Sequence, residues 1–166
     1  MKKRWISLYV ENEIGVLAKI SGLFSGKSYN VDSLTVGVTE DPTVSRMTIS
    51  LTSDDKTFEQ IKKQLNRSVE VIKVVDLTDI PIIMKEILFI KVSSCSVSDK
   101  DEIFHLSQVY HLQVIDYNKK TLMIQCVKTE ERNNDMIRLF AKLFPNRIEV
   151  VRGGSVAIES ISITER

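Results

Sequence analysis

Residues 10–24 read VENEIGVLAKISGLF, and within this stretch the pattern of a β-strand gives way to that of a helix. Residues 4–11 are apolar and rich in residue types that favour strands. From residue 16 the apolar residues recur at helical spacing, at positions Val16, Leu17, Ile20, Leu23 and Phe24. The stretch therefore predicts a strand followed by a helix, joined by a short loop that contains Asn12 and Gly15.

The rest of the first half predicts four more elements. Residues 29–38 and 44–51 are two alternating runs separated by the turn sequence TEDPT, and they predict a hairpin. Residues 53–65 predict a helix, because Asp54 and Asp55 are good cap residues and apolar residues follow on one face. Residues 69–77 predict a final strand. The order βαββαβ is that of a ferredoxin-like module.

The second half repeats this order. Trp5 and Ile87 begin equivalent strands, and the second module continues with a helix over residues 98–110, capped by Ser98, a hairpin, a second helix and a last strand. We predict an α+β fold of two tandem ferredoxin-like βαββαβ modules. The first spans residues 1–79 and the second residues 84–166, with a linker around Pro81 and an additional strand over 156–161.

Composition excludes several classes of function. The chain has 166 residues and a formal net charge of +1, without the excess of positive charge that binds nucleic acid. Its most apolar stretch, residues 80–90, contains Pro81 and the charged pair Lys85–Glu86, so no membrane-spanning segment is expected. Cys95 and Cys126 lack metal-binding spacing, and buried free thiols in a reducing cytoplasm are favoured over a disulfide. We expect a cytoplasmic protein.

No arrangement of residues typical of an enzyme is found. His105 and His111 are six residues apart, which does not place two imidazoles on one helical face for a metal ion. The paired carboxylates occur at predicted helix starts, where helix capping and the helix dipole explain them. Nucleotide-binding and nucleophile-elbow motifs are absent from the sequence. The sequence therefore favours a protein without catalytic activity and without a metal site.

The loop that contains Asn12 and Gly15 has two interpretations on the residues alone. The first N–H groups of a helix have no partners within the helix and attract anions, and glycine allows a ligand to approach the backbone. The Asn12 amide can both donate and accept, which suits a zwitterion, and Ile14, Val16 and Leu17 could contact a small apolar side chain. In the other interpretation, Asn12 and Gly15 only shape the turn.

Three sequence blocks resemble one family. They are ENEIGVL at residues 11–17, YNVDSLTV at 29–36 and DPTVSRMTI at 41–49. These blocks are similar to those of the regulatory small subunit of acetolactate synthase, also called acetohydroxyacid synthase, whose N-terminal module is an ACT domain. The resemblance extends through the second half, where EILFIKV and VIDY match the family more loosely.

The resemblance implies a non-catalytic subunit that activates a catalytic large subunit and confers feedback inhibition by valine in branched-chain amino acid biosynthesis. It implies a homodimer formed through the ACT domains, with thiamine diphosphate, magnesium and FAD bound to the catalytic partner. It also implies an effector site for valine between two chains. Its residues are Asn12, Gly15, Val16 and Leu17 of one chain, with Asn30 and Val31 of the other.

The chain departs from the family where glycine is usual and Ser28 stands here. We therefore expect Gly26 to adopt the left-handed conformation at the end of the first helix. Two alternatives to the family function stay open on the residues. One is an ACT-fold chain with its own small-molecule activity, and the other is an amino-acid sensor that acts on a different target.

Overall fold

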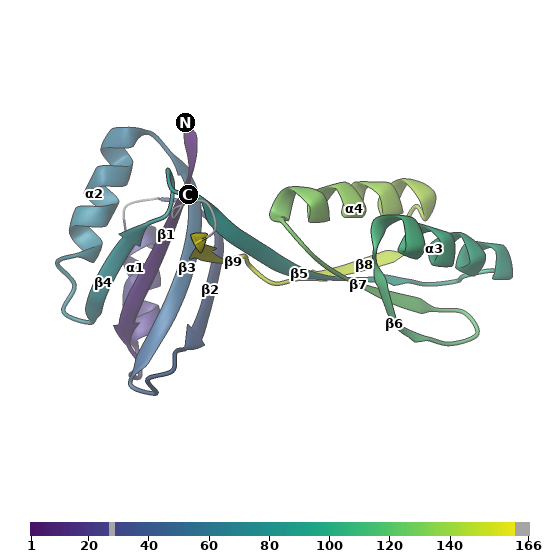
Figure 1. The fold of residues 1–166 in the computed structure, drawn as a ribbon, viewed down its shortest axis with the longest axis horizontal. Helices are drawn as coiled ribbons and strands as arrows, with labels where there is room; N and C mark the ends of the chain where they lie inside the picture. The colour runs from purple at the N-terminus through teal and green to yellow at the C-terminus, as the bar shows by residue number, and fades with distance from the viewer. Residues whose placement is uncertain (27–28, 162–166) are drawn as a thin grey trace. The chain divides into compact units, whose positions relative to one another are not determined.

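The structure is a computed structural model and describes residues 1–26 and 29–161 (Figure 1). It divides into two compact units, residues 1–83 with residues 155–161, and residues 84–154. The elements of the first unit are β1 (Lys2–Glu11), α1 (Val16–Ser25), β2 (Val31–Val38), β3 (Val44–Ser53), α2 (Asp55–Leu65), β4 (Val71–Asp76) and β9 (Val156–Glu159). Those of the second are β5 (Ile82–Val92), α3 (Val97–Tyr110), β6 (Gln113–Tyr117), β7 (Leu122–Lys128), α4 (Glu130–Leu143) and β8 (Ile148–Arg152).

The first unit is an antiparallel sheet with two helices on one face. Its strand order is β2-β3-β1-β4, so β2 and β4 are the edge strands. Alternate residues of β1 and β3 point toward the helices, and the apolar stripes of α1 and α2 cover them. This core consists of Ile6, Leu8, Val10, Val16, Ile20, Phe24, Met47, Ile49, Leu51, Phe58, Ile61 and Leu65.

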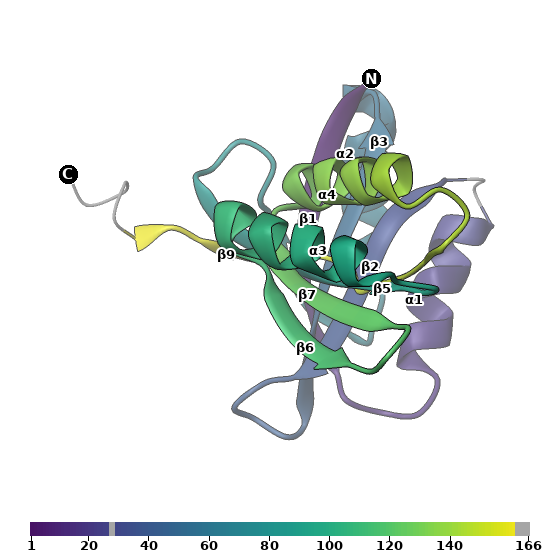
Figure 2. The ribbon, with the colours of Figure 1, turned by 90° about the vertical axis from the view of Figure 1, so that its right-hand side faces the viewer.

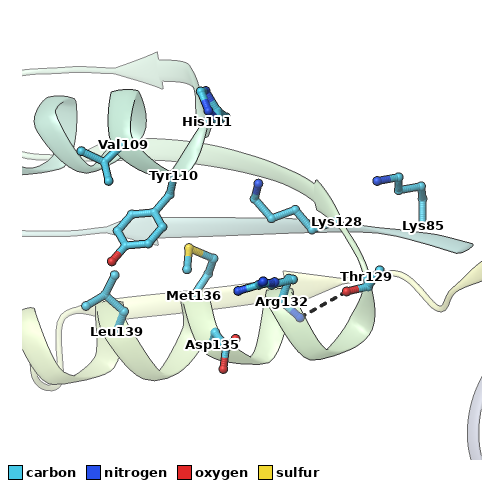
Figure 3. A pocket seen from close by; sticks show the side chains of 10 residues that line it. All are labelled: Lys85, Val109, Tyr110, His111, Lys128, Thr129, Arg132, Asp135, Met136 and Leu139. Carbon is cyan, nitrogen blue, oxygen red and sulfur yellow. Dashed lines mark hydrogen bonds between the residues drawn. The ribbon is translucent and has the colours of Figure 1, made fainter.

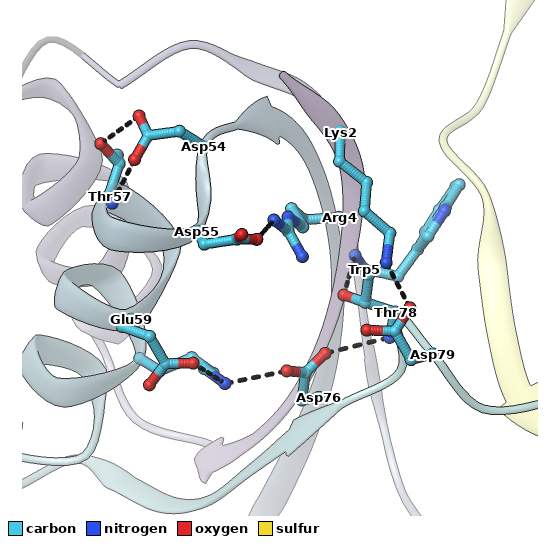
Figure 4. A network of polar contacts seen from close by, with 11 residues as sticks. Lys2, Arg4, Trp5, Asp54, Asp55, Thr57, Glu59, Asp76, Thr78 and Asp79 are labelled. Carbon is cyan, nitrogen blue, oxygen red and sulfur yellow. Dashed lines mark hydrogen bonds and ion pairs between the residues drawn. The ribbon is translucent and has the colours of Figure 1, made fainter.

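Charged side chains attach α2 to the sheet (Figure 4). Arg4 is buried on β1, where its guanidinium lies 4.9 Å from the centre of the Phe58 ring and forms an ion pair with Asp55. Lys62 donates from Nζ to Asp76 of β4 over 2.9 Å. These contacts join α2 to the central strand β1 and to the edge strand β4. They maintain the orientation of α2 on the sheet.

The C-terminal tail, residues 155–161, clusters with the first unit, and its strand β9 pairs with β5. Thr35 donates from Oγ1 to the carbonyl of Ser155 over 3.0 Å, and Arg46 donates from Nη2 to the carbonyl of Ala157 over 3.2 Å. Arg46 also donates to Ser7 and lies over the Tyr9 ring, on the sheet face opposite the helices. Polar side chains of this face thus hold the tail by hydrogen bonds to its backbone carbonyls. The spacing of apolar residues in the sequence does not predict such contacts.

The second unit repeats the arrangement with the strand order β6-β7-β5-β8. The helices α3 and α4 lie side by side on one face of this sheet (Figure 1, Figure 2). Its core consists of Leu88, Ile90, Val92, Cys95, Ile103, Leu112, Leu122, Ile124, Cys126, Met136, Phe140 and Phe144. The prediction of two tandem ferredoxin-like modules is therefore confirmed.

The two cysteines are free and buried, as expected. Burial raises the pKa of the Cys126 thiol to about 11, so the thiol is neutral and unreactive at physiological pH. No helix in the described part of the chain is both long and apolar enough to cross a membrane.

Two local predictions about helix ends are wrong. Ser96, not Ser98, caps α3, because the Ser96 side chain accepts a hydrogen bond from the Asp99 N–H and α3 begins at Val97. Gly26 is right-handed, with φ −63°, since its N–H donates to the Gly22 carbonyl and continues the helical turn. Ser28 lies outside the described residues.

The second unit should lose stability in acid through Asp99. Hydrogen bonds from Arg147 and from the Ser96 N–H lower the pKa of this carboxyl to about 2. Because the folded pKa lies below the ordinary value near 3.8, the stabilisation is complete above about pH 4 and is lost as pH falls through about 2. Asp99→Asn should lower the unfolding free energy near pH 7 by about 1 kcal/mol and weaken its dependence on pH below 4.

Urea unfolding followed by circular dichroism at several pH values would measure this effect. The single tryptophan, Trp5, lies in the first unit, so tryptophan fluorescence reports the unfolding of that unit. A change in circular dichroism that occurs without a change in fluorescence therefore reports the unfolding of the second unit. If the second unit of Asp99→Asn and that of the unsubstituted chain lose the same stability in acid, Asp99 is not the group responsible.

Candidate functional site

The loop between β1 and α1 is shaped by Gly15. This residue has φ 88° and ψ −10°, the left-handed conformation that side chains disfavour, and it directly precedes α1. A Cβ at this position would meet no heavy atom within 4 Å, so conformation and not crowding requires glycine. Within the described part of the chain, no side chain forms a capping hydrogen bond with the first turn of α1. The Val16 N–H donates to the Glu13 carbonyl over 3.4 Å, so among the described residues the N–H groups of Leu17 and Ala18 are those left for an external hydrogen-bond acceptor.

Asn12 fastens this loop to the turn between β2 and β3. Its backbone N–H donates to the Thr43 carbonyl over 2.7 Å, and its Nδ2 donates to the Pro42 carbonyl over 2.9 Å. Its Oδ1 accepts from the Ser45 hydroxyl over 3.0 Å. One N–H and one oxygen lone pair of the amide are left over. Asn12 thus shapes the turn, and its amide still has one donor and one acceptor available to a ligand.

The turn between β2 and β3, to which Asn12 bonds, is stabilised by its own hydrogen bonds. Asp41 accepts from both the N–H and the hydroxyl of Thr43, over 2.9 and 2.7 Å. These bonds hold the pKa of the Asp41 carboxyl below its ordinary value. The Thr39 N–H donates to the Val44 carbonyl and closes the turn. The sequence identified TEDPT as a turn but carried no sign that it supports the loop 30 residues earlier.

The apolar residues of the predicted site have different environments. The Val16 side chain is buried in the core of the first unit, so its contribution to any binding surface is limited to its backbone. Leu17 is 45% exposed, and Ile14 is fully exposed beside Gly15. Leu17 and Ile14 are therefore the apolar side chains that the loop presents.

Asn30 and Val31 lie far from this loop in the same chain. Val31 pairs with Leu51, which pairs with Arg4 near the start of β1, whereas the loop follows Glu11 at its end. The seven steps along β1 from Arg4 to Glu11 span about 24 Å of strand. The two groups of predicted site residues thus occupy opposite ends of the sheet, and one chain does not bring them together.

The edge strand β2 carries exposed apolar side chains. Val36 is 45% and Val38 59% exposed, and both lie toward the end of β2 that is nearer the loop. An edge strand with unpaired backbone groups and apolar side chains is prone to pair with another chain. Within the described residues, no group of three or more His, Cys, Asp or Glu side chains could hold a metal ion.

Family comparisons cover both units. Residues 6–73 match the model of the AHAS small subunit-like ACT domain, and residues 85–161 match the model described as the small subunit of acetolactate synthase. Together the two matches include all but residues 1–5, 74–84 and 162–166.

Individual proteins agree with these matches. The acetolactate synthase small subunit of Aquifex aeolicus is 39% identical over 99% of this chain and 85% of its own length. The acetolactate synthase isozyme 3 small subunit of Escherichia coli is 36% identical over 94% of each chain. The crystal structure of the Thermotoga maritima acetolactate synthase small subunit superposes with a TM-score of 0.87, at 32% identity, covering 96% of this chain and 98% of that one. The chain therefore belongs to the acetolactate synthase small subunit family, and its first unit is an ACT domain.

Proposed function

We propose that this chain is a regulatory, non-catalytic subunit that activates the catalytic large subunit of acetolactate synthase and confers feedback inhibition by valine. The observation that carries the proposal is the uncapped start of α1 behind the left-handed Gly15, in the ACT domain of a chain of this family. In this role the chain acts in the cytoplasm, in branched-chain amino acid biosynthesis.

The chemistry of the loop suits the valine zwitterion. The valine carboxylate would accept hydrogen bonds from the N–H groups of Leu17 and Ala18, where the helix dipole favours negative charge. The remaining lone pair of Asn12 Oδ1 could accept a hydrogen bond from the ammonium group. Leu17 and Ile14 offer an apolar surface to the isopropyl group.

A second copy of the chain would complete this site. If two β2 edges pair about a two-fold axis perpendicular to the sheet, they run antiparallel. The start of one β2, with Asn30 and Val31, then lies beside the end of the other β2, near the partner's loop. This arrangement joins the two groups of residues that one chain keeps apart, and it covers Val36 and Val38. We therefore propose a homodimer through the ACT domains.

The catalytic chemistry is assigned to the partner. Thiamine diphosphate, magnesium and FAD would bind to the catalytic large subunit, as the resemblance to the family implies. This chain would act by binding that subunit and by transmitting the effect of valine to it, which is a coupling between two separate sites.

Reconstitution tests the proposal directly. The chain alone should form no acetolactate from pyruvate, the catalytic subunit alone should show low activity, and the mixture should show higher activity that valine inhibits. Turnover by the chain alone would favour an enzyme. Valine binding without any effect on the catalytic subunit would favour a sensor for another target.

Valine should stabilise the first unit selectively. A ligand that binds only the native state adds about 2.7 kcal/mol at a hundredfold excess over its Kd. Because Trp5 is buried in the first unit, its fluorescence reports the unfolding of that unit in the full chain. We expect the fluorescence transition to shift to higher urea with valine, while hydrogen exchange of the α4 amides stays unchanged. An unchanged fluorescence transition would remove valine as the effector.

A further inference from the structure

The second unit contains a hollow of about 710 Å³ between the end of α3, β7 and α4. It is lined by Lys85, Val109, Tyr110, His111, Lys128, Thr129, Arg132, Asp135, Met136 and Leu139 (Figure 3). Its volume falls in the range of sites for small molecules. We call it the basic hollow. It is distinct from the loop proposed for valine, which lies in the first unit.

Three cationic side chains face the basic hollow from three elements. Lys85 comes from β5, Lys128 from the end of β7 and Arg132 from α4 (Figure 3). Within the described residues, their side chains form no hydrogen bond or ion pair, in contrast to Arg152 and Arg147 in the same unit. Cations gathered without partners repel one another, and an anion between them would relieve that repulsion.

The single carboxylate that lines the basic hollow does not neutralise these cations. Asp135 forms an ion pair with Arg138 over 2.5 Å, and Arg138 is not part of the lining. Arg132 also stands in the first turn of α4, where the helix dipole disfavours a positive charge. The position of Arg132 therefore costs stability in the free chain, which a role in binding explains.

The other end of the basic hollow is apolar. Figure 3 shows Tyr110, Met136 and Leu139 together at one end, while the amino groups of Lys85 and Lys128 and the Arg132 guanidinium lie toward the other. Tyr110 is 38% exposed, so its ring is available to a ligand. A monovalent anion would not balance three cations, and an inorganic ion would not cover the apolar end.

We infer that the basic hollow binds a small organic phosphate, with the phosphate among Lys85, Lys128 and Arg132 and an apolar or aromatic body against Tyr110 and Met136. Phosphate oxygens accept charge-assisted hydrogen bonds from all three cations. The basic hollow is then a second ligand site of the chain, separate from the loop proposed for valine.

Phenyl phosphate is the probe, titrated into the full chain with its methionine methyl groups labelled with ¹³C. Of the five methionines, only Met136 lines the basic hollow, so its methyl resonance reports binding there. Phenyl phosphate should shift this resonance at lower concentration than inorganic phosphate does, and phenol should have no effect. The double variant Lys128→Gln/Arg132→Gln should bind at least about tenfold more weakly, because two charge-assisted hydrogen bonds are lost.

A matched variant controls for net charge. Lys119→Gln/Lys142→Gln removes two exposed cations of the second unit outside the basic hollow, and its affinity should equal that of the unsubstituted chain. Equal weakening in both double variants would overturn the inference. So would equal affinity for inorganic and phenyl phosphate, or no Met136 shift up to about 10 mM probe. A Met136 shift caused by the catalytic subunit but not by phenyl phosphate would instead assign the hollow to protein docking. Since no arm uses valine or turnover, failure here leaves the proposed function untouched.

Discussion

Gly15→Asp is expected to abolish valine inhibition of the reconstituted synthase while activation of the catalytic subunit persists. The new carboxylate would lie at the start of α1, where we propose that the valine carboxylate binds, and it would repel that group. Activation should persist because it requires a protein interface and no effector. The left-handed conformation of residue 15 costs a side chain about 1 kcal/mol, and Asp tolerates it better than most residues.

Gly15→Ala is the control that distinguishes the effect of backbone strain at residue 15 from the effect of the added charge. Alanine suffers the same backbone conformation, but its Cβ would meet no neighbouring atom within 4 Å and carries no charge. We expect Gly15→Ala to keep valine inhibition and Gly15→Asp to show none, even at valine concentrations about tenfold above those that half-inhibit the unsubstituted complex. Acetolactate formation across a valine titration measures both. Loss of inhibition in both variants would point to backbone strain, and retention in both would show that the loop only shapes the turn.

Val36→Lys is expected to dissociate the homodimer and, with it, valine inhibition. Val36 lies on the edge strand β2, and a two-fold axis would bury it in both chains, so one substitution acts twice. Loss of two buried apolar side chains at about 1.5 kcal/mol each should weaken the dimer at least about a hundredfold. Because the valine site is proposed to span both chains, inhibition should fall together with dimerisation.

Ile72→Lys is the matched control. Ile72 is 57% exposed and lies on β4, the other edge of the same sheet, so the substitution also replaces an exposed apolar edge residue with a positive charge. Sedimentation velocity of both variants, with and without valine, gives the oligomeric state. A dimer that survives Val36→Lys but not Ile72→Lys would place the interface on β4. A monomer that still responds to valine would refute the shared site.

Several features of this protein were determined by its sequence alone. The strand-favouring composition of residues 4–11, the alternation of apolar residues in 29–38 and 44–51, and the helical spacing from Val16 to Phe24 are local signals. They predicted the order of the first unit, and similar signals predicted that of the second. Asp54 was identified as a cap for the same reason, since capping involves neighbouring residues. The three sequence blocks that resemble the small subunit family led to the family that the comparisons then identified.

Other features were decided only by tertiary structure. The tail joins the first unit through Thr35 and Arg46, residues more than 100 positions away. Asn12 bonds to the turn at Pro42, and Val31 lies at the far end of the sheet from Gly15, because strand register and not sequence distance sets these relations. The basic hollow likewise gathers Lys85, Lys128 and Arg132 from separate elements. Periodicity reports which face of an element is apolar, whereas only the packing of elements determines which side chains meet.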